Sequence, residues 1–339
     1  MSRPFTRSRI GTTIKPDFSD VLIKPTKSSL SSRSQVNLNV RYTFKHSKNI
    51  YEGIPIVSSN MDTISTARMY NELSTHGLMT CFSKHFDDYE LCHVYRDDMM
   101  ISMGTEFGSI INHIQKFSPK YVCIDVANGY MDALLHTIDK FKKLYQHRDI
   151  TLCVGNVVTP ERVETLIRDF GVDIVKVGIG SGGVCSTRMK TGVGYPQFSC
   201  VRECADAARE HGGYLMSDGG IRTPSDIAKA FGAGADFVMV GSILAGHDEC
   251  EGDVVYTING LCMRFYGMSS KRAMEKYSGG VNSYRSPEGE DILVEYKGPV
   301  KNTVLDILGG LRSTCTYTGN PTLSQFIGNA EFIKVNKQK

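Results

Sequence analysis

One cysteine differs from the other nine in the segment that carries it. Cys185 lies at the centre of GIGSGGVCSTRMKTGVGYPQ at 178–197, which is dense in glycine and longer than a usual strand-to-helix connection. Flanking backbone amides and Arg188 would favour the thiolate form of this side chain. A buried, inert thiol is the simpler interpretation of a lone cysteine, and we expect it for the others. For Cys185 the setting is a poor place for core packing, so the sequence predicts a nucleophile.

Two glycine-rich segments further along the chain have the composition of phosphate-binding turns. They are SDGGIRTPSD at 217–226 and VGSILAG at 240–246, and each leads from a predicted strand toward a helix. Glycine leaves backbone N–H groups free to approach a phosphate, whereas glycines that only form turns are the alternative. Because the segments follow the last two predicted strands, we interpret them as a phosphate site.

A further acid or base is available in a long polar segment between about residues 250 and 312. It contains FYGMSSKRAMEKYSGGVNSYRSPEGE and exceeds the length of a simple connection. A mobile flap that closes over substrate is one interpretation, and a small accessory hairpin is the other. Glu288 stands in a sharp turn between Pro287 and Gly289, from which it could return to the site as an acid or base.

Eight short apolar runs must position these residues, and each is continuous, as is typical of strands buried on both faces. They are IPIVSSN at 54–60, LMTCFSK at 78–84, MMISMGT at 99–105, YVCIDVA at 121–127, TLCVGNV at 151–157, DIVKVGI at 173–179, YLMSDGG at 214–220 and DFVMVGS at 236–242. Segments with helical spacing follow most of them, such as ALLHTIDKFKKLY at 133–145 and PSDIAKAFGAG at 224–234.

The repeating strand-then-helix unit predicts an α/β fold with parallel strands, closed as a (β/α)₈ barrel or open as a doubly wound sheet. The octet GVDIVKVG at 171–178 recurs as GADFVMVG at 234–241, and such an internal repeat favours the closed barrel. Polar residues stand near the carboxyl ends of five predicted strands: Asn60, Lys84, Asp125, Asn156 and Asp218. A barrel brings these ends to one mouth, although each residue alone could be a helix cap.

Composition excludes several classes of protein. The 339 residues are 41% hydrophobic and 22% charged with a formal charge of +3, which gives no reason to expect a nucleic-acid or membrane partner. The first residues lack a signal peptide, and no apolar stretch is long enough to span a bilayer, so a cytoplasmic protein is expected. The ten cysteines form no CxxC pair, and Cys200 and Cys204 fit helix packing better than a metal site.

Motifs along nearly the whole chain resemble the family of inosine monophosphate dehydrogenases and guanosine monophosphate reductases. They include DFSDVLIKP at 17–25, IPIVSSNMDT at 54–63, DVANGY, GNVVT, the Cys185 segment, SDGGI, FGAGADFVM, YGMSS, YKG and GGLRSTCTY. The resemblance implies one (β/α)₈ catalytic domain over residues 1–339. It also implies an N-terminal segment at about 1–50 and a flap inserted after strand 8 at about 250–312.

Several features are more similar to the reductase branch of that family. Only about fifteen residues separate Lys84 from the third strand, which leaves no room for a CBS pair, and YRSPEGEDILVEYKG resembles the shorter reductase flap. The resemblance therefore implies NADPH-dependent conversion of guanosine monophosphate (GMP) to inosine monophosphate (IMP) and ammonia. An IMP dehydrogenase without CBS domains is the alternative, and a silent barrel that only binds purine nucleotides is a second one.

The resemblance also implies roles for individual residues. Cys185 would form a covalent thioimidate at C2 of the purine, while Thr187 and Glu288 would handle the proton of the leaving amine. The implied substrate-binding residues are Asp218, Gly219, Gly220, Gly241, Ser242, Tyr266, Gly267, Met268, Ser269, Arg285, Ser286, Pro287 and Gly289. The implied cofactor-binding residues are Lys84, Asp125, Val126, Ala127, Ile179, Gly180 and Tyr284, joined by Ser32, Arg33, Ser313, Thr314, Cys315 and Thr316 from a neighbouring subunit of a homotetramer. A potassium ion would lie at Gly180, Gly182, Cys185 and Arg188.

Overall fold

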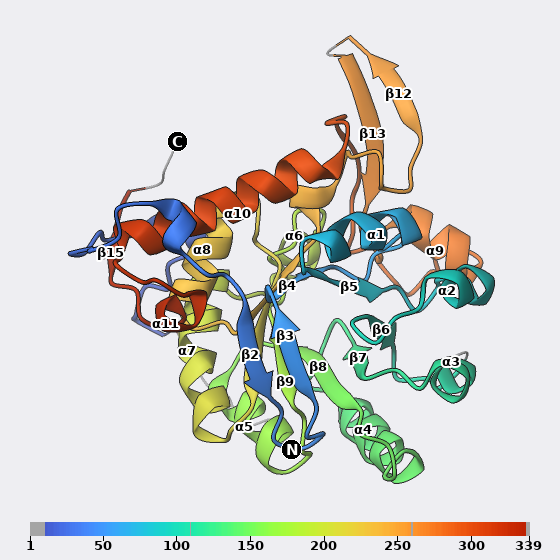
Figure 1. Ribbon diagram of the computed structural model, residues 1–339. Helices are drawn as coiled ribbons and strands as arrows, with labels where there is room; N and C mark the ends of the chain where they lie inside the picture. The colour runs from blue at the N-terminus through green and yellow to red at the C-terminus, as the bar shows by residue number, and fades with distance from the viewer. Residues whose placement is uncertain (1–10, 109, 259, 337–339) are drawn as a thin grey trace, which may run out of the picture.

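Eight parallel strands close into a barrel in the computed structural model, which describes residues 11–108, 110–258 and 260–336. The barrel strands are β4 (Ile56–Ser58), β5 (Met79–Phe82), β6 (Met100–Met103), β7 (Tyr121–Asp125), β8 (Thr151–Val157), β9 (Ile174–Val177), β10 (Tyr214–Asp218) and β11 (Phe237–Val240). Each lies within one of the eight predicted apolar runs, and β11 pairs with β4 to close the ring (Figure 1). The predicted (β/α)₈ fold is therefore confirmed. The first ten residues, expected to hold no leader, lie outside the described ranges.

Helices cover the outside of this ring because each presents one apolar stripe to the strands. They are α1 (Ala67–Thr75), α2 (Asp88–Val94), α3 (Ile110–Phe117), α4 (Asp132–Leu144), α5 (Pro160–Arg168), α7 (Gln197–Glu210), α8 (Pro224–Gly232) and α10 (Val300–Tyr317). The short α6 (Thr187–Thr191) lies instead within the Cys185 segment and has no buried residue. In α5, for example, proline starts the helix and Val163, Leu166 and Ile167 form its buried stripe. Cys200 and Cys204 are both buried in α7, as helix packing predicts.

An aromatic cluster closes the amino-terminal end of the barrel. The hairpin of β2 (Val40–Thr43) and β3 (Ile50–Gly53) lies across this end (Figure 1). The Tyr42 ring lies 4.6 Å from that of Tyr214 at the start of β10, and the Tyr51 ring lies 5.1 Å from that of Phe237 at the start of β11. This end is packed, so the carboxyl ends of the strands remain as the open mouth.

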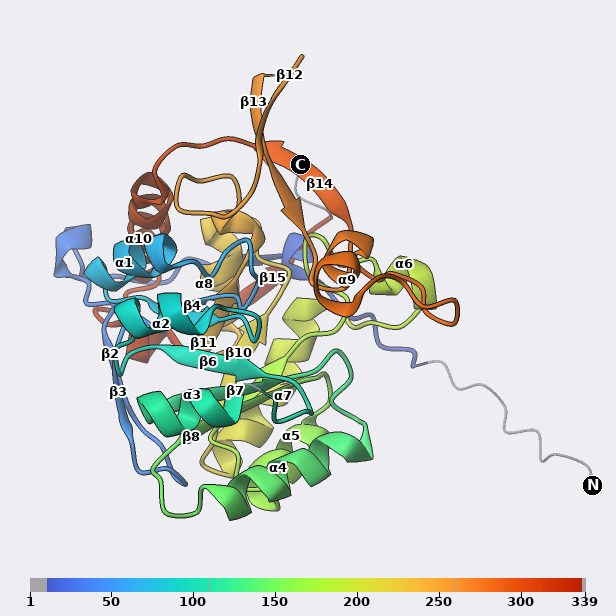
Figure 2. The ribbon, with the colours of Figure 1, turned by 90° about the vertical axis from the view of Figure 1, so that its right-hand side faces the viewer.

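A separate three-stranded sheet follows the eighth barrel strand. It consists of β12 (Val254–Thr257), β13 (Gly260–Tyr266) and β14 (Asp291–Glu295), with helix α9 (Lys271–Ser278) between its last two strands. The β12–β13 hairpin projects away from the barrel (Figure 2), while α9 lies beside its mouth. We call residues 250–299 the insertion.

The insertion ends earlier than the expected boundary near residue 312. Helix α10 begins at Val300, and its buried residues Val300, Val304, Ile307, Leu308 and Leu311 recur at helical spacing. That stripe packs on the barrel in the place of an eighth outer helix, so residues 300–312 belong to the barrel. The assignment of residues 1–50 to a separate N-terminal segment stays a prediction.

Short elements complete the molecule. Strand β1 (Val21–Ile23) pairs antiparallel with β15 (Phe332–Lys334), which joins the two ends of the described chain. The others are the 3₁₀ turns η1 (Phe18–Asp20), η2 (Arg33–Gln35) and η3 (Ser242–Leu244), and helix α11 (Leu323–Phe326). Within the described ranges, no helix has both the length and the apolar character needed to cross a membrane.

Candidate active site

A cleft opens at the carboxyl ends of the barrel strands. Its walls come from the ends of β4 and β7 through β11, from the Cys185 loop and from the insertion. The location matches the face at which barrel enzymes carry out their chemistry.

The Cys185 loop is fixed at its base by buried polar contacts. Gln197 at the start of α7 is fully buried and donates from Nε2 to the Val177 carbonyl at 2.9 Å and to Ser217 Oγ at 3.1 Å. Its Oε1 accepts a hydrogen bond of 3.0 Å from Ser181, inside the loop. The loop therefore starts from a rigid support, and Cys185 at its far end is half-buried and lines the cleft.

Three side chains form one hydrogen-bonded line in the cleft. The Cys185 thiol donates to Thr187 Oγ1 at 3.3 Å, and the Thr187 hydroxyl donates to Glu288 Oε2 at 2.7 Å. The insertion delivers Glu288 by pairing with the Cys185 loop, since Ser186 N donates to the Glu288 carbonyl at 2.8 Å and Glu290 N to the Val184 carbonyl at 2.9 Å. The structure thus brings together the three residues that the sequence predicts as catalytic.

Most of the predicted substrate-binding residues line the same cleft: Asp218, Gly219, Gly220, Gly241, Ser242, Gly267, Met268, Ser269 and Gly289. Gly219 has a φ of +88°, and a Cβ there would lie 2.5 Å from Ser181 Oγ and 3.0 Å from Gly182 N. A Cβ on Gly183 would lie 2.3 Å from Ser242 Oγ. Only glycine allows these loops to lie so close together, and their exposed amides suit a phosphate.

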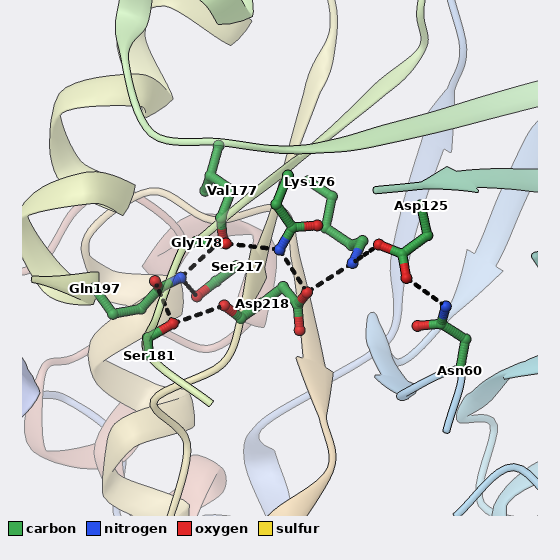
Figure 3. A network of polar contacts seen from close by, with 10 residues as sticks. Asn60, Asp125, Lys176, Val177, Gly178, Ser181, Gln197, Ser217 and Asp218 are labelled. Atoms are coloured by element: carbon green, nitrogen blue, oxygen red, sulfur yellow. Dashed lines mark hydrogen bonds and ion pairs between the residues drawn. The ribbon is translucent and has the colours of Figure 1, made fainter. Parts of the chain in front are cut away.

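A buried lysine joins four of the polar strand ends, and sequence reasoning missed it. Lys176 Nζ lies 2.8 Å from Asp125 Oδ1 and 2.6 Å from Asp218 Oδ2. Asn60 donates to the second oxygen of Asp125 at 2.7 Å, and Asn156 donates to Asp218 Oδ2 at 2.8 Å. Figure 3 shows the resulting chain of contacts across the mouth of the barrel. The predicted convergence of Asn60, Asp125, Asn156 and Asp218 is therefore real, and a cation stands at its centre.

Charge pairing sets the protonation states in this network. Burial alone would lower the pKa of the Lys176 ammonium, but Asp125 and Asp218 together raise that pKa well above its ordinary value. Burial would raise the pKa of the Asp125 carboxyl, but Lys176 and Asn60 hold it below its ordinary value. Lys176 is thus charged and Asp125 ionised at neutral pH.

Tyr266 does not reach the cleft, contrary to the sequence prediction. Its hydroxyl donates to Asp62 Oδ2 at 2.6 Å, and the preceding residue, Phe265, lines the cleft instead. Successive side chains of a strand point to opposite faces, so only one of the two neighbours in β13 can face the site. The alternation along YTINGLCMRFY would have been the signal, once that segment was recognised as a strand.

Four other predicted residues lie outside the cleft lining. Tyr284, Arg285 and Ser286 are exposed, and Pro287 is half-buried in the same loop. The guanidinium of Arg188 contacts the N-terminal segment and its own loop, with Nη1 3.5 Å from Asp17 Oδ2 and Nη2 donating to the Tyr195 carbonyl. Arg188 therefore holds the loop against the N-terminal segment.

The predicted cofactor residues fall into separate places. Asp125, Val126, Ala127, Ile179 and Gly180 line the main cleft, and Lys84 lines a neighbouring cavity with residues 102–108. Ser32, Arg33, Ser313 and Thr316 line a third cleft, which shares no described residue with the first. Thr314 is absent from that lining, and Cys315 is fully buried on the inner side of α10, so its side chain faces the core.

The four positions predicted for potassium all lie in the segment 178–197 that carries Cys185. Cys185 N donates to the Gly182 carbonyl at 3.1 Å, and this bond brings two of the four positions together. Backbone carbonyls are oxygen ligands that suit a hard cation, and each has a second lone pair for it. The Arg188 side chain packs on Gly180 through its aliphatic part.

Comparison with known proteins gives consistent matches over the full length of the chain. The model of the IMP dehydrogenase / GMP reductase domain matches residues 16–93 and 100–339. GMP reductase 1 of Homo sapiens is 47% identical over 341 residues, which cover 97% of this chain and 98% of that protein. GMP reductase of Vibrio cholerae serotype O1 is 45% identical with 98% of both chains covered, and GMP reductase of Phytophthora infestans is 44% identical with 97% and 93% covered.

Proposed function

Because this chain belongs to the IMP dehydrogenase / GMP reductase family, we propose that it reduces GMP with NADPH to IMP and ammonia. The observation that carries the proposal is the line Cys185–Thr187–Glu288, which places a thiol, a hydroxyl and a carboxylate in hydrogen-bond contact inside one cleft. The balanced reaction consumes GMP, NADPH and two protons and yields IMP, NADP⁺ and an ammonium ion.

The chain's own groups account for the deamination half of the reaction. Cys185 Sγ forms a bond to C2 of the purine, and its proton passes through the Thr187 hydroxyl to Glu288. Glu288 then returns a proton along the same path to the 2-amino group, which leaves as ammonia. This protonation is required because an amide anion is too basic to leave, and a positioned acid removes that barrier. The product of this half is a thioimidate on Cys185.

The nucleotide is held by backbone groups around the cleft. Gly219, Gly220, Gly241 and Ser242 would bind the phosphate, and Asp218 would bind the ribose hydroxyls. Asp218 uses Oδ2 for both Lys176 and Asn156, and no partner is seen for Oδ1 within the described ranges. That oxygen is thus available as an acceptor in the cleft.

NADPH, when bound, supplies the hydride that reduces C2 and so allows the Cys185–C2 bond to break. Asp125, Val126, Ala127, Ile179 and Gly180 share the cleft with Cys185 and would hold the reactive end of the cofactor. The proposal is supported by the position of these residues, which line the same cleft as Cys185 and Asp218. A potassium ion at the carbonyls of Gly180, Gly182 and Cys185 would stabilise the loop that carries the thiol.

A neighbouring subunit would complete the cofactor site in a homotetramer. The third cleft, with Ser32, Arg33, Ser313 and Thr316, has no lining residue in common with the catalytic one. Its residues would therefore serve the site of another subunit, and Arg33 offers a cation to a phosphate group of the cofactor.

A turnover assay tests the proposal against the dehydrogenase alternative. Incubation with GMP and NADPH should lower the absorbance of NADPH and release ammonia. Activity with IMP and NAD, together with no loss of NADPH, would instead favour the dehydrogenase.

Replacement of the thiol separates catalysis from binding. We expect Cys185→Ala to abolish turnover while the dissociation constant for GMP stays within about 3-fold of wild type, because the phosphate loops lie on other strands. Mass spectrometry of the quenched wild-type enzyme should find a purine on the peptide that contains Cys185. A folded wild type that binds nucleotide but shows neither turnover nor this adduct would favour a binding module.

A further inference from the structure

Lys176 is buried in the middle of strand β9 and contacts the two carboxylates that face the cleft. Only 2% of its side chain is exposed, and its ammonium lies between Asp125 on one side and Asp218 on the other. In Figure 3 these three side chains form a continuous bridge between the ends of β7, β9 and β10. Asp125 belongs to the part of the cleft assigned to the cofactor, and Asp218 to the part assigned to the nucleotide.

Packing alone does not account for a lysine at this position. The repeated octets GVDIVKVG and GADFVMVG place Met239 in β11 where Lys176 stands in β9. Both residues line the cleft, so an apolar side chain fills the equivalent position of the same barrel. Burial of an ammonium has a large desolvation cost, which two close carboxylates offset. The lysine is therefore matched to the two carboxylates rather than to the core.

The contacts leave each carboxylate only one arrangement. Both oxygens of Asp125 are engaged, one by Lys176 and one by Asn60. Asp218 receives Lys176 and Asn156 on a single oxygen, which directs the other oxygen away from them. Without the cation, two negative groups at the wall of the cleft would repel each other and would separate. A shift of either one then changes the position of the other through the shared ammonium.

We propose that Lys176 is a positioning residue that couples the nucleotide and cofactor sites, because it fixes Asp218 and Asp125 relative to each other. This inference rests on the proposed function for the identity of the two ligands. A nucleotide that fixes Asp218 through its ribose also fixes Asp125, so the cofactor finds a carboxylate that is already oriented. Nucleotide binding should therefore strengthen cofactor binding, and the reverse must hold by the same factor.

Equilibrium titration of the full-length enzyme measures this coupling. IMP is the nucleotide used, because IMP and NADPH bind together without turnover. The coupling factor is the dissociation constant of NADPH without IMP divided by that with saturating IMP. We expect a coupling factor of about 5 or more for wild type and a factor within about 2-fold of one for Lys176→Met. The factor of Lys176→Arg should lie between these two values or equal that of wild type. Both separate dissociation constants should also rise in Lys176→Met.

A second buried lysine provides the matched control. Lys229 in α8 is also 2% exposed, and its ammonium donates to the Phe18 carbonyl at 2.9 Å, away from the cleft lining. Lys229→Met should keep the wild-type factor. Loss of coupling in that variant too would assign the effect to the fold and overturn the proposal, as would a wild-type factor of one.

Further variants keep the test decisive if Lys176→Met does not fold. Lys176→Gln can donate to one carboxylate but carries no charge, so it should lose the coupling, and retention of the wild-type factor in this variant would refute the role. Turnover of GMP by the same wild-type preparation is measured in parallel. If the wild type turns over GMP but Lys176→Met keeps the wild-type coupling factor, the inference about Lys176 is rejected and the proposed function stands. If the coupling factor depends on Lys176 but the wild type does not turn over GMP, the proposed reaction is rejected and the inference stands.

Discussion

At the scale of single residues, the proposed chemistry depends on a hydroxyl between a thiol and a carboxylate. Thr187 is the first residue of α6, and its Oγ1 accepts from Cys185 at 3.3 Å and donates to Glu288 at 2.7 Å. Cys185 and Glu288 are 103 positions apart in the chain but meet because residues 184–186 pair with residues 288–290. Of the two partners in this hydrogen-bonded line, only Thr187 is also close to Cys185 in the sequence.

Replacement of Thr187 tests the proton path directly. Thr187→Val keeps the shape but removes the hydroxyl, so we expect kcat to fall about 10²- to 10⁴-fold, the usual contribution of a positioned acid–base group. Thr187→Ser should stay within about 10-fold of wild type. The measurement is steady-state turnover of GMP with NADPH, with the KM for GMP expected to change little.

The control for this pair lies in the same short helix. Thr191 is exposed at the end of α6, and its hydroxyl donates to the Thr187 carbonyl at 2.8 Å. Thr191→Val should leave kcat unchanged. Full activity of Thr187→Val would exclude the relay and leave Glu288 to act by another route.

At the scale of elements, one aspartate of the barrel accepts three hydrogen bonds from the insertion. Asp62 follows β4 and accepts on Oδ2 from Tyr266 of β13 at 2.6 Å, from Tyr277 of α9 at 2.6 Å and from Lys276 at 2.9 Å. The ring of Tyr277 also stacks on His85 after β5, with centroids 3.8 Å apart and an interplanar angle of 8°. We infer that this contact keeps the insertion in the position in which Glu288 reaches Thr187.

Weakening this contact should loosen the insertion. In Asp62→Asn the carboxylate charge that Lys276 and the two tyrosines share is lost, at a cost of about 1–2 kcal/mol. We expect kcat to fall about 10-fold and residues 250–299 to be cleaved faster in limited proteolysis. Asp253→Asn is the control, because Asp253 lies in the insertion but is 67% exposed and pairs only at the surface, with Arg264 and Arg272. Equal behaviour of the two variants would show that Asp62 does not hold the insertion.

The sequence predicts some elements well for a definite physical reason. Strands buried on both faces need continuous apolar runs, so all eight barrel strands could be predicted from the positions of such runs in the sequence. The start of α10 is harder to predict because it directly follows the polar insertion, although Val300, Val304 and Leu311 show helical spacing. The face on which Tyr266 lies follows from the alternation of β13, which becomes clear only once that segment is known to be a strand.

Barrel geometry alone does not predict that Lys176 belongs to the site. The barrel geometry predicts that strand ends converge, and this brought Asp125 and Asp218 into the candidate site. It does not predict which side chain within an apolar run points inward. The internal repeat contains the signal, because Lys176 in the first octet is equivalent to Met239 in the second. A lysine at a position that otherwise holds an inward apolar side chain indicates a buried group of opposite charge beside it.

At the scale of the whole molecule, the two ends of the barrel have different roles. The carboxyl end holds the cleft, whereas the amino end is closed by the β2–β3 hairpin and its aromatic contacts. Asp236, just before β11, lies at this closed end, where Oδ2 accepts from Leu215 N at 2.9 Å and its carbonyl accepts from Tyr42 at 3.2 Å. Residues here affect stability and not the reaction.

Asp236 should make the stability of the protein depend on pH. Burial raises the pKa of its carboxyl from 3.8 to about 7, so the folded state binds the proton more tightly than the unfolded state. Stability is then lost as pH rises from about 4 to 7. We expect Asp236→Asn to gain on the order of 2 kcal/mol over wild type between pH 5 and pH 8, measured by urea unfolding at fixed protein concentration. Asp306→Asn, on the exposed side of α10, should show no such gain, and a pH-independent difference for Asp236→Asn would contradict the assignment.

Mixing two inactive variants tests whether one subunit completes the site of another. Cys185→Ala lacks the thiol, and Arg33→Glu should lose cofactor binding in the neighbour's site. In co-expressed mixed oligomers, a site is intact when an Arg33→Glu subunit, which keeps Cys185, receives Arg33 from a Cys185→Ala neighbour. Random assembly of the two variants gives this arrangement for about one quarter of the sites. Activity near that fraction is expected, measured with GMP and NADPH. A mixture of Cys185→Ala and Glu288→Gln should remain inactive, because both defects lie in one subunit's own cleft. No recovery in the first mixture would place Arg33 in its own subunit's site or outside the cofactor site.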